Sequence, residues 1–112
     1  MESKRSEIRI GVELDENNVP QDIRWMASDT DVNSAAAKAF MLSVWDPKEN
    51  NTLRMDLWTK EMTVEEMKKF TYQHLTTLAD TFERATGEKN MSGAIREFAR
   101  MFGLEMQVIR ED

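Results

Sequence analysis

The spacing of the apolar residues changes once along this chain, from every second position to every third or fourth. Between residues 6 and 58, apolar and polar side chains alternate, as in strands that bury one side. From residue 63 to residue 102, the apolar residues recur at the spacing of amphipathic helices. Strands followed by helices predict an α+β fold, in which two C-terminal amphipathic helices cover one face of an antiparallel sheet built from two hairpins. The length of 112 residues fits a single domain over residues 1–112.

Two alternating stretches near the N-terminus predict the first hairpin. The apolar side chains of the first stretch fall on one side and are Ile8, Ile10, Val12 and Leu14. After the turn-forming residues 15–20, the second stretch places Ile23, Trp25 and Ala27 together on one side. Trp25 is therefore expected on the side that faces the core.

A second hairpin is predicted between residues 40 and 58. Its turn lies at residues 46–51, where Pro47 suits the second position of a β-turn. The side chains expected to face the core are Phe40, Leu42, Val44, Leu53, Met55 and Leu57. Both hairpins together fall within residues 6–58.

Strong end signals mark the two helices of residues 63–102. Thr63 and Glu66 have the spacing of a capping box, which begins a helix. Gly87 is a natural end for this first helix. The second helix is predicted over residues 91–102, with Gly103 as its stop.

Two short segments have less regular patterns. Residues 34–39 are rich in alanine, and their helix propensity predicts one helical turn before the next strand. Residues 104–109 alternate weakly and predict either an edge strand or an extended tail. The sheet is therefore expected to have four strands, or five if residues 104–109 add one.

The charge balance limits the classes of partner. The chain has 15 basic and 21 acidic residues, so its net charge is −6, which disfavours binding to nucleic acid. It has no cysteine, which excludes disulfides and thiolate metal sites and fits a reducing compartment. The charged N-terminus lacks the apolar segment of a signal peptide, and no apolar run is long enough to insert into a membrane. We therefore expect a cytoplasmic protein.

No catalytic arrangement can be drawn from the sequence. His74 is the single histidine, and a lone histidine on an apolar helix stripe is more often a boundary residue than a ligand. The carboxylates lie mostly in turns and caps, and Asp15-Glu16-Asn17 lacks the later ligands of a calcium loop. The four glycines form no phosphate-binding motif. We predict a protein that is not an enzyme and that holds no cofactor and no metal.

The outer face of the second hairpin is the candidate site. The alternation points Met41, Trp45 and Trp58 away from the helices, with Arg54 between them along the sequence. Exposed aromatic side chains beside arginine are typical of protein-binding surfaces. The alternative is that a loop or the N-terminal arm covers this face within the monomer. Because sheet edges are exposed in such a fold, we also expect a homodimer, formed through a strand edge or through this outer face.

Several stretches resemble the gliding motility-associated protein GldC family of Bacteroidetes. The resemblance covers nearly the whole chain and is weaker after about Asn90. It is most specific in Trp-Asp-Pro-Lys at residues 45–48 and in Leu-Ala-Asp-Thr-Phe-Glu-Arg-Ala-Thr-Gly at residues 78–87. The other similar stretches are residues 7–17, 19–20, 23–25, 41–49 and 51–60.

The resemblance implies a small soluble accessory protein of the gliding machinery, with no catalytic residue and no cofactor. Together with the missing catalytic arrangement, it leads to the hypothesis that the chain binds a protein partner and does not insert into a membrane. A second hypothesis, from another class, is a small-ligand-binding α+β domain with a cryptic pocket around His74, Tyr72 and Trp25.

Overall fold

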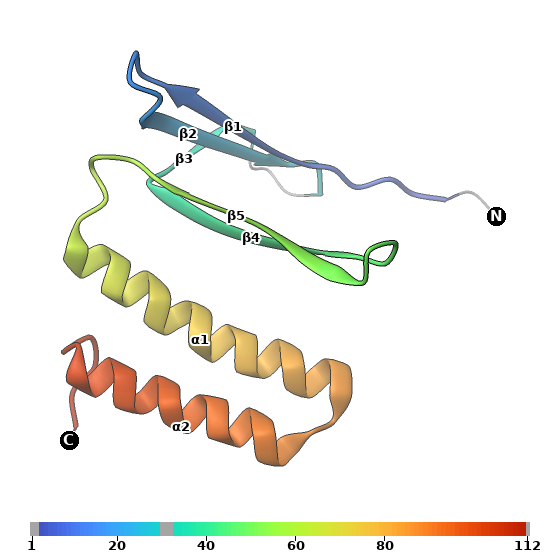
Figure 1. Ribbon diagram of the computed structural model, residues 1–112, viewed down its shortest axis with the longest axis vertical. Helices are drawn as coiled ribbons and strands as arrows, with labels where there is room; N and C mark the ends of the chain where they lie inside the picture. Colours follow the sequence, from blue (N-terminus) through green and yellow to red (C-terminus); the bar gives the residue numbers. More distant parts are fainter. Residues whose placement is uncertain (1–2, 30–32, 112) are drawn as a thin grey trace. The chain divides into compact units, whose positions relative to one another are not determined.

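The computed structural model describes residues 3–29 and 33–111 of the chain. These residues form β1 (Ile8–Leu14), β2 (Pro20–Ala27), β3 (Ala35–Ala37), β4 (Ala39–Asp46), β5 (Asn51–Trp58), α1 (Val64–Thr86) and α2 (Lys89–Glu105) (Figure 1). The chain divides into two compact units, residues 1–62 with the strands and residues 63–112 with the helices. The α+β class is as predicted. The predicted single domain, and the covering of a sheet face by the helices, concern both units together and stay predictions.

The strands form two sheets, so the prediction of one four- or five-stranded sheet is wrong. One sheet has the order β1-β2-β3 and the other has the order β4-β5, and all the pairings are antiparallel. The change of partner occurs at Lys38, because Ala37 pairs with Ile23 of β2 whereas Ala39 pairs with Trp58 of β5. Both predicted hairpins are present, but they are joined through β3 instead of forming one continuous ladder.

Strand β3 lies where a helical turn was predicted. Its three alanines pair with Ile23, Arg24 and Trp25 in the middle of β2. Pairing with a neighbouring strand outweighs the helix propensity of alanine, which amounts to only a few tenths of a kcal/mol per residue over most other residues. A short run of small residues therefore adds a third strand to the first hairpin.

The apolar side of the three-stranded sheet is centred on Ile23. The register places Val12 and Ala37 on either side of Ile23, and it places Ile10 and Ala35 on either side of Trp25. Paired residues lie on the same face of a sheet, so the predicted apolar sides of β1 and β2 coincide. Ile23 is only 1% exposed, which makes it the centre of the core of this unit.

Helix α1 has the ends that the sequence predicts. The Glu66 amide donates to Thr63 Oγ1 at 3.0 Å, and the Thr63 amide donates to Glu66 Oε1 at 3.0 Å, which completes the capping box. At the other end, Gly87 adopts the left-handed conformation with φ 74° and donates its amide hydrogen to the Glu83 carbonyl.

Helix α2 does not stop at Gly103 as predicted. Gly103 lies inside the helix and is buried. It packs so closely against α1 that a side chain there would collide with the ring of Tyr72. The chain turns back after Glu105, and the amides of Val108 and Ile109 donate to the Gly103 carbonyl. Residues 104–109 therefore form a helix end and a turn, and the predicted edge strand is wrong.

The two helices lie side by side and meet along small residues (Figure 1). The buried positions are Ala79, Ser92, Ala99 and Gly103. Helical spacing then gathers the larger apolar side chains on one face of the pair. This face carries Leu75, Leu78, Phe82, Met91, Ile95 and Phe98. No helix within the described ranges is long and apolar enough to cross a membrane.

Candidate protein-binding surface

The turn of the second hairpin holds β4 and β5 in a regular ladder. The Lys48 amide donates to Asp46 Oδ1 at 3.0 Å, and Asn50 adopts a left-handed conformation with φ 56°. Asparagine and aspartate favour such turns because their side chains bond to nearby backbone groups. The ladder then runs without a register shift from Asp46 and Asn51 to Ala39 and Trp58.

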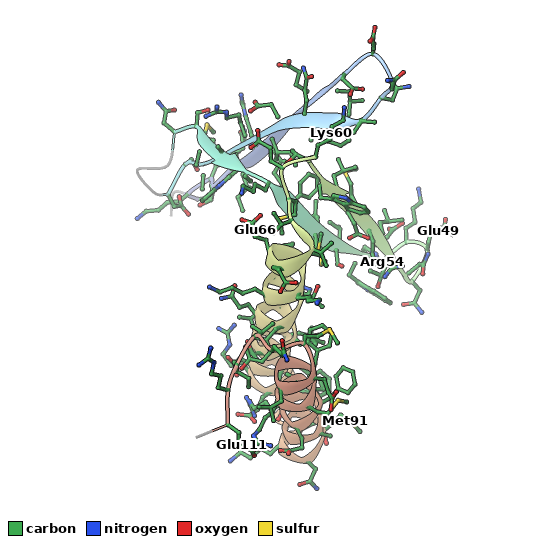
Figure 2. All side chains as sticks on the ribbon, turned by 90° about the vertical axis from the view of Figure 1, so that its left-hand side faces the viewer. Glu49, Arg54, Lys60, Glu66, Met91 and Glu111 are labelled. Atoms are coloured by element: carbon green, nitrogen blue, oxygen red, sulfur yellow. The ribbon has the colours of Figure 1, made fainter. Side chains whose placement is uncertain are left out.

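The register brings all four predicted site residues to one face of the β4-β5 sheet. Trp45 pairs with Thr52, Met41 pairs with Asp56, and Arg54 pairs with Ser43. Trp58, which pairs with Ala39, lies on the same face, since side chains alternate along a strand. We call Met41, Trp45, Arg54 and Trp58 the tryptophan stripe. Figure 2 shows Arg54 near the end of the hairpin that carries Glu49 in its turn.

The tryptophan stripe is exposed. Trp45 is 58% exposed, Trp58 is 57% exposed, and Met41 and Arg54 are also exposed. The two tryptophans lie at opposite ends of the ladder, six residues apart along β4, which corresponds to about 20 Å. Met41 and Arg54 lie between them. The stripe therefore offers two aromatic contact points with a cation between them.

The opposite face of the same hairpin is also exposed, which the sequence did not predict. Leu42 pairs with Met55, and Val44 pairs with Leu53. Leu53 is 56% exposed and Met55 is 55% exposed. The half of this face that lies nearer the turn is therefore little covered by the rest of its unit. Alternation could show that these residues share a face, but it could not show how much of that face is buried.

The acidic turn between β1 and β2 is a structural cap. Asp15 Oδ1 accepts the amides of Asn17 at 2.8 Å and Val19 at 3.0 Å, and Oδ2 pairs with Lys60 Nζ at 3.0 Å. The backbone amide of Val19, the Lys60 ammonium and the Asn17 amide together lower the pKa of Asp15. Both carboxylate oxygens are therefore used within the fold.

Among residues 3–29 and 33–111, no group of three or more His, Asp or Glu side chains is arranged to hold a metal ion.

His74 and Tyr72 occupy different environments on α1. His74 is exposed, and its carbonyl accepts the hydroxyl of Thr77 at 3.1 Å. The Tyr72 ring lies in the seam of the two helices, against Gly103. Trp25, the third residue of the predicted pocket, belongs to the strand unit.

A polar bridge ties α1 to α2. Ser92 Oγ and Arg96 Nη1 donate to Glu83 Oε1 at 2.7 and 3.0 Å, and Arg96 Nη2 donates to Asp80 Oδ1 at 2.9 Å. The Ser92 hydroxyl and the Arg96 guanidinium lower the pKa of Glu83. The bridge lies on the side of the helix pair opposite to its apolar face.

Acid is expected to weaken the helix pair through Glu83. Its lowered pKa stabilises the folded state at pH values above the ordinary glutamate pKa of about 4.3, and this contribution is lost as the pH falls through the folded-state value. The melting temperature of Glu83→Gln should therefore lie below that of the unchanged protein at pH 7, and the difference should shrink toward pH 3. Circular dichroism at 222 nm measures both. Glu97→Gln is the control, because Glu97 is exposed and, among the described residues, forms an ion pair with Arg100 alone, at 3.9 Å. Parallel melting curves for Glu83→Gln and the unchanged protein at every pH would contradict the assignment.

The fold and the stripe describe a small α+β protein with an exposed aromatic face. The chain matches the family described as gliding motility-associated protein GldC-like over residues 20–108, and it belongs to this family. The match begins later than the resemblance seen in the sequence, and it includes residues 90–108, where that resemblance was weaker. No curated protein and no solved structure was found to match the chain.

Proposed function

We propose that this protein is a non-enzymatic accessory of the bacterial gliding machinery and that it acts by binding a protein partner through the tryptophan stripe. Membership of the GldC-like family supports the link to gliding. The exposed pair Trp45 and Trp58 carries the proposed binding mode, because the fold gains little from large aromatic side chains that remain more than half exposed. The same side chains offer a partner a large contact area.

The chemistry of the stripe favours a protein partner. Tryptophan and arginine are enriched among the residues that contribute most to protein interfaces, whereas the net charge of −6 opposes binding to a phosphate backbone. The absence of a catalytic motif in the sequence supports a binding role. The cysteine-free composition supports the cytoplasm as the proposed location.

Truncation of the stripe is expected to abolish partner binding without unfolding the protein. Tagged protein would be added to the lysate of a gliding bacterium, and the recovered proteins compared for the unchanged chain and for Trp45→Ala/Trp58→Ala. Removal of a central aromatic contact typically costs about 2 kcal/mol or more of binding, which is roughly thirtyfold in Kd. A partner retained by the unchanged chain should be lost from the double variant, whose melting temperature should change little.

Leu57→Ala is the matched control, because Leu57 neighbours Trp58 on β5 but faces the other side and is half-buried. This variant should retain the partner while losing about 1–3 kcal/mol of stability. If Trp58→Ala lowers the melting temperature as much as Leu57→Ala does, the stripe has a structural role. If the double variant retains every partner, the binding mode is wrong.

A further inference from the structure

Within residues 3–29 and 33–111, the β4-β5 sheet has two strands, and each strand is eight residues long. Two-stranded hairpins are marginally stable in water, and sheets gain stability from further strands. Both faces of this hairpin carry exposed apolar side chains, including Trp45, Trp58, Leu53 and Met55. The outer edge of β5 is therefore a place where a further strand would stabilise the fold.

The alternating hydrogen-bonding pattern of β5 shows which of its backbone groups face that edge. The Thr59 amide donates to the Lys38 carbonyl at 2.8 Å, in line with the register that pairs Leu57 with Phe40. Alternate residues of β5 thus bond to β4, and the residues between them point their N–H and C=O groups outward. The outward set is Thr52, Arg54, Asp56 and Trp58. Within the described ranges, none of them forms a backbone hydrogen bond to a segment other than β4.

Arg54 and Asp56 have no ion-pair partner among the described residues. Elsewhere in this unit, two arginines of β1 and β2 form ion pairs with a carboxylate two residues earlier in the chain. Arg9 bonds to Glu7, and Arg24 Nε lies 3.3 Å from Asp22 Oδ2. The two unpaired charges of β5 therefore mark its edge as different from that of β1.

We propose that a second copy of this chain adds its β5 to this edge, antiparallel, with the two-fold axis at Met55. Arg54 of each copy then lies opposite Asp56 of the other, which gives two symmetric pairs of opposite charge. The apolar residues Leu53 and Leu57 are also placed opposite each other. The product is a four-stranded sheet with Leu53, Met55 and Leu57 of both copies on one face.

The side-chain charges and the backbone hydrogen-bonding pattern both favour this register over the neighbouring registers. An axis at Arg54 would place two arginines opposite each other, and an axis at Asp56 would do the same with two aspartates. An axis midway between two residues would set outward-pointing backbone groups against groups already bonded to β4. The axis at Met55 satisfies both conditions.

The expected dimer is weak. A single strand edge buries less than the roughly 800 Å² per partner of a standard interface, so the dissociation constant should be on the order of micromolar.

The inference does not depend on the proposed gliding partner, although Arg54 and Trp58 belong to both surfaces. It is tested on the purified chain alone, so its failure would leave the proposed function standing.

Charge reversal tests the register directly. Sedimentation equilibrium over a concentration series should show the unchanged chain rising from 13.1 kDa toward twice that mass. Arg54→Asp and Asp56→Arg should each raise the dimer dissociation constant by roughly tenfold to a hundredfold, since each creates two like-charge contacts. An equal mixture of the two variants should recover dimers, because one copy supplies two acidic residues and the other supplies two basic ones. This recovery also shows that both variants are folded.

Arg9→Glu is the control on another sheet edge, that of β1, and it should leave the dissociation constant unchanged. Three results would each overturn the proposal: a monomer at all concentrations, single reversals without effect, or failure of the mixture to recover dimers. Loss of the dimer in Arg9→Glu alone would place the interface on β1 and would equally overturn it.

Discussion

Gly103→Ala should destabilise the helix pair, whereas Gly93→Ala, the same substitution in the same helix, should stabilise it. At Gly103 a new Cβ would lie 2.7 Å from Tyr72 Cε1 and 2.9 Å from Ile109 Cγ1, and at Gly93 it would meet nothing within 4 Å. Both changes gain up to about 1 kcal/mol from helix propensity. Only the first adds an overpacking cost of about 1–3 kcal/mol.

The difference between the two variants isolates the close approach of the helices, because the propensity gain is common to both. Urea unfolding followed at 222 nm should give Gly93→Ala the higher free energy of unfolding, by about 1–3 kcal/mol. Equal stability of the two variants would mean that the Tyr72 ring moves aside at little cost. The seam at Gly103 would then be loosely packed.

The features that the sequence predicted correctly are those set by local chemistry. The ends of α1 follow from Thr63, Glu66 and Gly87, whose capping bonds reach no further than four residues along the chain. The hairpin turns follow from Asp15 and Asp46 in the same way, since each accepts amides of the next few residues. Such signals need no knowledge of the rest of the fold.

The errors arise where a distant segment decides the local structure. The alanines of β3 become a strand because β2 offers them partners, and Gly103 continues α2 because the helix approaches Tyr72 closely. Local propensity indicates the opposite in both cases. The division into two sheets at Lys38 is likewise a matter of which strand pairs with which.

The sequence could predict which residues share a face of the second hairpin, but not how exposed each face is. Alternation correctly placed Trp45, Trp58 and Arg54 on one face, because the side-chain period of a strand is two residues. It gave no means of predicting that Leu53 and Met55, on the other face, would be as exposed as the tryptophans. Exposure depends on how many strands and layers surround a residue.

Ile23→Ala should cost the strand unit about 2–4 kcal/mol of its free energy of unfolding. Ile23 is 1% exposed and lies between Val12 and Ala37 in the three-stranded sheet. Removing three of its carbon atoms forfeits their burial and leaves a cavity. Small neighbours such as Ala37 have few atoms with which to fill that cavity.

The chain offers its own probes and a matched control for this measurement. All three tryptophans lie within residues 1–62, so fluorescence follows the strand unit, while ellipticity at 222 nm follows mainly the helices. Ile8→Ala removes the same atoms from the same face of the sheet, but Ile8 is 73% exposed, so its loss should stay below about 1 kcal/mol. A large loss for Ile23→Ala beside a small loss for Ile8→Ala would place the core of this unit at Ile23. Comparable losses would instead mean that the exposed face around Ile8 is covered in solution, by another part of the chain or by a second copy.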